Sequence, residues 1–150
     1  MTKLLLSLHV LAAILAIGPV AVAASMFPRY GAAAPAGGGD GTAGILHRIC
    51  RGYTYVGVAV PVFGIATAGQ MGVLTDAWLL ASIVLTIAAA VLLLAVILPG
   101  QERLLDDRDA GADRRSGLVK RLHMTTGIFN LLWAVVVVLM IVRPGSTTGA

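Results

Sequence analysis

Four long apolar runs divide the chain, and short or polar stretches separate them. The runs cover about residues 4–27, 52–74, 77–98 and 122–142. Each run is continuous rather than alternating, which is typical of helices and excludes the strands of a membrane barrel. About 20 apolar residues cross the hydrocarbon core of a bilayer as a helix. The pattern predicts an all-α membrane protein with a single domain, an up-down bundle of four transmembrane helices.

The second and third runs are joined by a very short corner formed by Thr75 and Asp76. Two membrane helices joined so tightly must run antiparallel. We therefore expect the second and third spans to touch each other and to form a helical hairpin in the bilayer. This hairpin is the element around which the first and fourth spans are expected to be arranged.

The two longer connections carry the polar residues of the chain. Residues 28–51 include a glycine- and alanine-rich stretch without periodicity, which is typical of a flexible loop. Pro99 and Gly100 are expected to end the third span, because proline interrupts the hydrogen bonding of a helix. Residues 99–121 then form the strongly charged segment, whose mixed signs and glycines favour a solvated loop over a binding patch.

The composition agrees with a membrane domain. Hydrophobic residues make up 58% of the chain and charged residues 12%, whereas soluble domains average about 25% charged residues. The single cysteine excludes an internal disulfide and a zinc or iron–sulfur centre built on cysteines. A sequence pI near 9.8 would suggest nucleic acid in a soluble protein. Here the membrane topology explains the positive charge, so no nucleic-acid partner is expected.

The basic residues predict an orientation. Nine of the 11 lie in the first and third connections: Arg29, Arg48 and Arg51 in residues 28–51, and six more in residues 99–121. Because excess lysine and arginine mark the cytoplasmic side, both connections are expected in the cytoplasm and both termini outside it. The alanine- and glycine-rich usage favours a bacterial plasma (inner) membrane. Arg29, Arg48 and Arg51 are also candidates for contact with anionic lipid headgroups.

One ionisable residue, His9, lies within a predicted span. Ionisable residues inside a membrane are costly and are functional candidates for that reason. A neutral imidazole ligates haem or a metal, relays a proton, or donates a hydrogen bond to a neighbouring helix. The residues by themselves leave the structural role and the ligand or relay role open.

Two further histidines, His47 and His123, lie at the predicted cytoplasmic entrances of the second and fourth helices. About 20–30 Å of bilayer separates them from His9, so the three do not share a metal ion, whose ligands lie at about 2 Å. His47 and His123 lie at similar depth, and Cys50 is one turn from His47. They are weak candidates for a metal site. The alternative is a pair of interfacial histidines near headgroups and a small structural cysteine.

Small residues in the second run suggest close helix contacts. Gly57, Pro61 and Gly64 fall on closely related faces of one helix. Gly64, Ala68 and Gly72 follow at spacings of four, which allow two helix backbones to approach each other. These residues are expected to serve packing.

Polar residues inside the spans are few. Asn130 lies deepest in the fourth run, one turn after Thr126, and an interhelical hydrogen bond is favoured over catalysis. No acidic residue lies inside a run, which disfavours a proton-coupled transporter that depends on a carboxylate. The chain shows no Ser/His/Asp arrangement, phosphate-binding loop or zinc-protease motif.

The two ends of the chain carry a family likeness. LLLSLHVLAAI, followed by MFPRY, resembles the first helix of small four-helix integral membrane proteins of unknown function, and VVVVLMIVRPG is similar to their last helix. More distantly, both resemble HemJ-type protoporphyrinogen oxidases and copper-resistance membrane domains. In the HemJ group a histidine of helix one is implicated in haem b binding, which implies His9 as an axial ligand here. In place of that group's polar residues in helix three, this chain offers Ser82 and Thr86.

Three functions are compatible with these patterns. We expect an accessory or interaction subunit without enzymatic activity, packed as a homo-oligomer or against a larger membrane-protein complex in the lipid bilayer. The alternative is a haem b-binding redox protein with His9 as axial ligand. A small transporter or channel ranks third, because no polar path lines the predicted spans.

Overall fold

The computed structural model describes residues 1–33, 41–107 and 111–145. Within these ranges every regular element is helical, and four helical stretches are long and apolar enough to cross a membrane. These stretches are Thr2–Ala33, Thr42–Met71, Ala77–Asp106 and Ala112–Val142. The prediction of an all-α chain with four candidate membrane-spanning helices is therefore confirmed.

Two of the four stretches are divided into shorter elements. The elements in chain order are α1 (Thr2–Ala33), α2 (Thr42–Gly57), α3 (Ala59–Met71), α4 (Ala77–Leu92), the π-helix η1 (Leu93–Ile97), α5 (Leu98–Asp106) and α6 (Ala112–Val142). α1 and α6 are continuous, whereas the second stretch joins α2 to α3 and the third joins α4, η1 and α5.

The helices extend well beyond the apolar runs. α1 and α2 fill most of the predicted loop 28–51, and α5 and α6 fill most of the predicted loop 99–121. Hydropathy marks the apolar part of a helix, but charged and polar residues continue the same i→i+4 hydrogen bonding beyond it. Part of the glycine-rich stretch, residues 34–40, lies outside the described residues.

Proline divides the second stretch. Pro61 has no N–H to donate to the carbonyl of Gly57, the residue at which α2 ends. α3 begins at Ala59 and therefore carries Pro61 in its first turn, where proline is tolerated. The result is an interruption of the helical hydrogen bonding at Val58, close to the middle of the stretch, while the φ of −61° and ψ of −29° at Val58 stay helical.

The helix of the third stretch does not end at Pro99 but forms a wider, π-helical turn before it. The N–H of Leu98 donates to the carbonyl of Leu93, five residues back, so η1 has π-helical hydrogen bonding. In a regular α-helix the ring of Pro99 would clash with the carbonyl of Ala95, and the wider turn relieves this contact. The expectation that Pro99 and Gly100 end the third span is therefore wrong, because α5 continues to Asp106.

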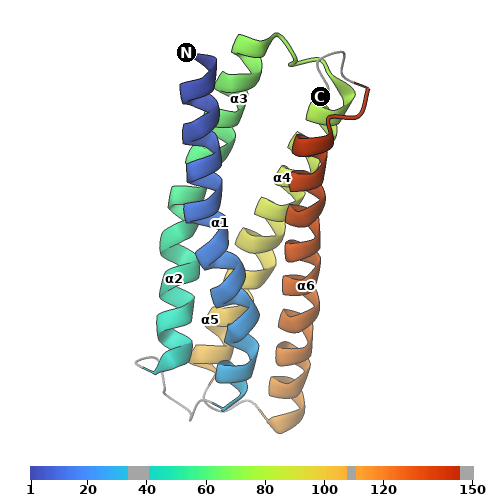
Figure 1. Cartoon of the computed structure of the whole chain (residues 1–150). Coiled ribbons are helices and arrows are strands. Elements are labelled where there is room, and N and C mark those ends of the chain that lie inside the picture. Colours follow the sequence, from blue (N-terminus) through green and yellow to red (C-terminus); the bar gives the residue numbers. More distant parts are fainter. Residues whose placement is uncertain (34–40, 108–110, 146–150) are drawn as a thin grey trace.

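α1 is the central helix of the bundle. It packs against α2, α3, α5 and α6, whereas α4 packs mainly against α6 (Figure 1). α2 reaches the third stretch through α5, but α3 and α4 hardly touch each other beyond their corner. The expected contact between the second and third spans is thus confined to the α2–α5 end and to the α3–α4 corner. The start of α1 and the end of α6 lie beside the α3–α4 corner.

Two buried clusters hold the bundle together. The larger one joins α1, α2, α5 and α6 around Phe27, Cys50 and Ile97, which are fully buried. The smaller one lies near the α3–α4 corner around Ala68 and Trp78. The large cluster thus fixes α2 and α5 at one end, and the small cluster fixes α3 and α4 at the other.

The small residues of the second stretch differ in their roles. A Cβ on Gly64 would lie 2.9 Å from Cε1 of His9, so this glycine permits close packing of α3 on α1. Ala68 is buried within the chain. Gly57 and Gly72 have open space where a Cβ would be. Gly72 ends α3 with a φ of 71°, a left-handed conformation that favours glycine, and its packing role stays a prediction.

Candidate functional site

A cavity of about 170 Å³ lies inside the bundle, lined by residues of all four long stretches. We call it the mid-bundle cavity, because its lining residues come from near the middle of each apolar run. They are Ala16, Ile17, Val20, Tyr53, Thr54, Gly57, Val58, Pro61, Thr86, Ala90, Leu93, Leu94, Phe129 and Trp133. The cavity separates the second stretch from the third at the depth where these two stretches do not pack against each other.

Both irregular segments of the fold contribute to its walls. Val58, at the break between α2 and α3, lines one side, and Leu93 and Leu94 of η1 line the other. π-helical turns occur often at functional sites, since they change the direction in which side chains project. Val58 and Leu94 are also more than half exposed, so the cavity opens to the surface of the bundle.

The lining is mostly apolar, and its side-chain polar groups belong to Tyr53, Thr54, Thr86 and Trp133. Thr54 Oγ1 donates to the Cys50 carbonyl at 2.6 Å, and Thr86 Oγ1 donates to the Ser82 carbonyl at 2.7 Å. Each hydroxyl hydrogen is therefore engaged, but each oxygen keeps a lone pair. The Gly57 carbonyl adds a third acceptor, because Pro61 has no N–H for it.

His9 has a structural contact rather than a place in this cavity. Its Nδ1 lies 2.8 Å from the carbonyl oxygen of Val60, and since a carbonyl only accepts, Nδ1 carries the hydrogen and donates. The ring fills the notch left by Gly64. His9 thus joins α1 to α3 by a hydrogen bond and by packing.

The haem b that the resemblance implies does not fit the cavities we describe. The mid-bundle cavity and a smaller cavity between α5 and α6 contain no histidine, cysteine or methionine in their linings. A haem in either cavity would lack the histidine ligand that the resemblance assigns to helix one. His9 instead lies against α3, where its Nδ1 is committed to Val60.

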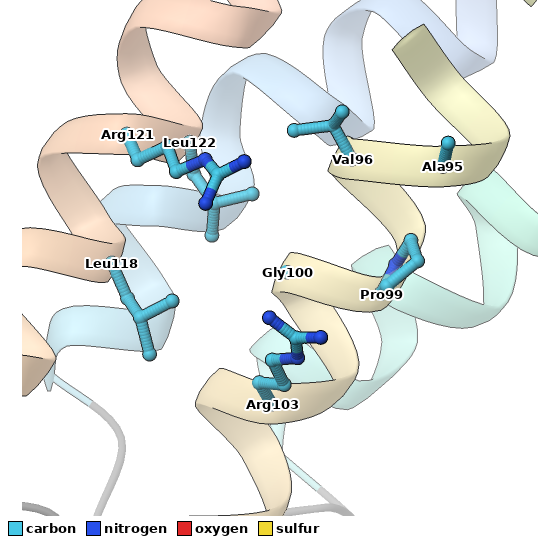
Figure 2. A pocket seen from close by; sticks show the side chains of 8 residues that line it. All are labelled: Ala95, Val96, Pro99, Gly100, Arg103, Leu118, Arg121 and Leu122. Carbon is cyan, nitrogen blue, oxygen red and sulfur yellow. The ribbon is translucent and has the colours of Figure 1, made fainter. Parts of the chain in front are cut away.

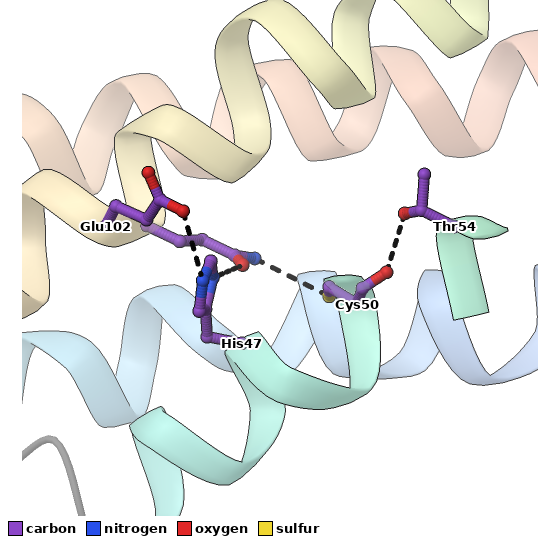
Figure 3. Close-up of polar contacts among 5 residues, drawn as sticks. His47, Cys50, Thr54 and Glu102 are labelled. Carbon is purple, nitrogen blue, oxygen red and sulfur yellow. Dashed lines mark hydrogen bonds and ion pairs between the residues drawn. The ribbon is translucent and has the colours of Figure 1, made fainter. Parts of the chain in front are cut away.

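A buried polar cluster joins α2 to α5 at the end of the bundle opposite the α3–α4 corner (Figure 3). We call His47, Cys50, Gln101 and Glu102 the His47 cluster. His47 Nδ1 lies 2.9 Å from Gln101 Oε1 and donates to it, and Gln101 Nε2 donates to Cys50 Sγ at 3.6 Å. Glu102 Oε1 lies 3.6 Å from His47 Nε2 at the more exposed edge. Gln101 is only 1% exposed.

The predicted metal candidates are only partly brought together. His47 and Cys50 both belong to the His47 cluster, where Gln101 lies between them, whereas His123 is exposed on α6. In the ranges that the structure covers, no group of three or more metal-ligating side chains of His, Cys, Asp or Glu is found. The cluster serves as a hydrogen-bonded contact between α2 and α5.

Gln101 belongs to the segment predicted to be a solvated loop, but it is buried on α5. A signal for its burial exists in the sequence. Ile97, Gln101 and Leu104 follow at spacings of four and three, which place them on one face of a helix that continues past Pro99. All three side chains are buried. The assumption that proline ends the helix hid this periodicity.

Asn130 joins α6 to α1. Its Nδ2 donates to Ser25 Oγ at 3.0 Å, and Ser25 Oγ donates to the Ala21 carbonyl at 2.6 Å. On the same face of α6, Thr126 Oγ1 and Trp133 Nε1 are buried without a partner among the described residues. This face of α6 therefore carries buried polar atoms that have no partner among the described residues.

The predicted lipid-contact arginines lie on the surface. Arg29 is on α1, and Arg48 and Arg51 are on α2, all exposed at the end of the bundle that carries the His47 cluster. At the same end, Arg115 Nη2 donates to the Gly31 carbonyl at 2.7 Å and fastens α6 to the end of α1.

No known protein family, curated protein or solved structure matches this chain.

Proposed function

We propose that this chain is a membrane-embedded binding protein that takes a small ring-containing lipophilic molecule from the bilayer into the mid-bundle cavity. The observation that carries the proposal is the cavity itself, which is open, apolar and lined by all four long stretches. Its volume of about 170 Å³ is close to that of an engineered apolar cavity of about 150 Å³ that binds benzene. A single six-membered ring with small substituents therefore matches the space.

The acceptor atoms of the cavity favour a ligand that donates a hydrogen bond, and the unpartnered Trp133 N–H in the same lining suits a ligand oxygen that also accepts one. Thr54 Oγ1, Thr86 Oγ1 and the Gly57 carbonyl accept, while both threonine hydrogens are engaged with the backbone. A ring that bears a hydroxyl group, such as a phenol, satisfies these acceptors. A purely hydrocarbon ring gains the apolar contacts but leaves the acceptors unused, at a cost of about 0.5–1.5 kcal/mol per hydrogen bond.

The supply of ligand follows from where the chain is proposed to reside. We place the protein in a bacterial inner membrane, with the end that carries the His47 cluster in the cytoplasm. Nine of the 11 basic residues belong to the connections at that end. The cavity then lies at about the middle of the bilayer and opens between the second and third stretches, so lipid-dissolved molecules reach it laterally.

Binding is testable with a heavy-atom phenol. The chain has two tryptophans, Trp78 and Trp133, and only Trp133 lines the cavity. In detergent micelles, 4-bromophenol is expected to quench the fluorescence of a W78F variant with a saturable curve, because a bound bromine lies beside Trp133. Bromobenzene is expected to bind up to about tenfold more weakly, since it lacks the hydroxyl hydrogen.

Two matched leucine variants define the site. Ala90→Leu fills the cavity from its exposed wall and is expected to abolish the saturable phase. Ala88→Leu adds the same side chain on the same helix at an exposed position outside the lining and should leave the curve unchanged. Quenching that stays linear in W78F, or that is equally saturable with Ala90→Leu, contradicts the proposal.

The proposed orientation has its own test. In a Cys50→Ser background, Thr2→Cys should react with a membrane-impermeant maleimide added to intact cells. Ser116→Cys, in α6 near the His47 cluster, should react only after the cells are made permeable. The reverse labelling pattern contradicts the orientation, and labelling of both positions from outside contradicts a membrane crossing between them.

Association with copies of itself or with a larger assembly remains a prediction. The small-residue faces that suggested it are partly used inside the chain, because Gly64 and Ala68 pack internally. Haem binding through His9 likewise remains a prediction, one without a cavity to support it. The geometry supports the binding of a small lipophilic molecule better than either.

A further inference from the structure

A second, smaller cavity of about 40 Å³ lies between α5 and α6 and carries two arginines (Figure 2). Arg103 projects from α5 and Arg121 from α6, and their guanidinium groups extend toward the gap between these helices. Gly100 and Leu122 hold the helices close together here, because a Cβ on Gly100 would lie 2.9 Å from Leu122 Cδ2. Both arginines therefore border one small space.

This pair of cations lacks anionic partners. Over the residues that the structure describes, the guanidinium groups of Arg103 and Arg121 make no hydrogen bond or ion pair. Of the nearby acids, Glu102 faces His47 and Asp107 pairs with Arg114 at 3.8 Å, while Asp106, one turn after Arg103, is exposed and makes no ion pair among the described residues. Two like charges at one cavity repel each other, and the repulsion grows as the effective dielectric constant falls near a membrane. An anion between the two guanidinium groups would attract both of them and offset this repulsion.

We propose that Arg103 and Arg121 bind the phosphate group of an anionic phospholipid. The guanidinium group forms paired hydrogen bonds with phosphate oxygens, and two of them hold one phosphate from both sides. A cavity needs about 10–15 Å³ to hold a water molecule. The 40 Å³ here therefore has room for one tetrahedral group.

The surroundings identify a lipid as the source of the phosphate. Next to the arginines the cavity is lined by Ala95, Val96 and Leu122, an apolar wall suited to the start of an acyl chain. Arg121 immediately precedes the apolar run 122–142, and Arg103 lies about 7 Å past the end of the run 77–98 at 1.5 Å per residue. Both arginines thus lie at headgroup depth in the proposed membrane placement. This site is separate from the mid-bundle cavity and does not depend on the ligand proposed there.

The test is a set of thermal unfolding curves of the purified chain in a neutral detergent. Dioctanoyl phosphatidylglycerol is expected to raise Tm by at least about 4 °C, as ligands that bind the folded state do. Dioctanoyl phosphatidylcholine and inorganic phosphate at the same concentrations are expected to raise it by less than half as much. An equal shift with inorganic phosphate overturns the lipid as the source, and no shift with any of the three overturns the site.

Two pairs of substitutions separate this site from general surface charge. R103Q/R121Q should lose the phosphatidylglycerol shift, whereas R114Q/K120Q removes the same charge from exposed positions at the same end and should keep it. Equal losses in the two double variants overturn a specific site. R103K/R121K keeps both positive charges and serves as the test variant if the glutamine variant does not fold. It should retain less than half of the shift, because lysine does not form the paired contact, and a full shift overturns recognition by the guanidinium pair.

Discussion

Replacing Gln101 with alanine should lower the free energy of unfolding by about 2–4 kcal/mol, the largest stability loss we expect from a single polar residue here. Gln101 is buried between α2 and α5 and hydrogen-bonds both His47 and Cys50. Its truncation leaves a cavity and also leaves the N–H of His47 Nδ1 without its partner. The measurement is unfolding in neutral micelles by a denaturing detergent, followed by circular dichroism.

The chain offers a matched control in its other glutamine. Gln70 is exposed near the end of α3, so Gln70→Ala should change the free energy of unfolding by less than about 0.5 kcal/mol. Gln101→Met keeps most of the volume but loses the hydrogen bonds and should fall between the two. If Gln101→Ala were no more harmful than Gln70→Ala, α5 would not be packed against α2 as described.

Replacing Pro61 with alanine should weaken binding of 4-bromophenol at least tenfold while raising stability. Alanine supplies the N–H that the Gly57 carbonyl lacks, so α2 and α3 can join into one helix across Val58. One added backbone hydrogen bond is worth about 0.5–1.5 kcal/mol. The same change straightens a wall of the mid-bundle cavity and removes an acceptor from it. Binding and stability are thus expected to change in opposite directions.

A second intrahelical proline serves as the control for this prediction. Pro28 lies inside α1, which is continuous, and it does not line the mid-bundle cavity. Pro28→Ala should leave the saturable quenching of Trp133 unchanged, whatever it does to stability. Tight binding by Pro61→Ala would show that the helix break is incidental to the cavity.

The two cavities are both products of irregular helices. η1 contributes Leu93 and Leu94 to the mid-bundle cavity and Ala95 and Val96 to the one between α5 and α6. A π-helical segment therefore lies between an apolar cavity in the middle of the bundle and a cavity bordered by two arginines near its end. Because the test ligands differ, a phenol and a phospholipid, the two proposals succeed or fail independently.

The sequence by itself determined the class of this protein. Four apolar runs, each near the length of a membrane span, lead to four long helices, and the clustering of basic residues separates the two ends. Proline also lies at the two places where the helices are irregular, but the sequence led to a helix end at Pro99 and to a packing role for Pro61. These features are local, because they depend on hydropathy and on backbone hydrogen bonding within one segment.

Only the tertiary structure decided which faces of the helices meet. In a membrane, the lipid-facing and inward-facing sides of a helix are both apolar, so hydropathy does not distinguish them. The contact of His9 with Val60 and the burial of Gln101 beside His47 depend on shape and hydrogen bonding between helices. The sequence of one apolar run does not contain this information. The mid-bundle cavity follows from the same cause: between the α3–α4 corner and the α2–α5 contact the second and third stretches do not pack together, although their short connection had suggested direct contact.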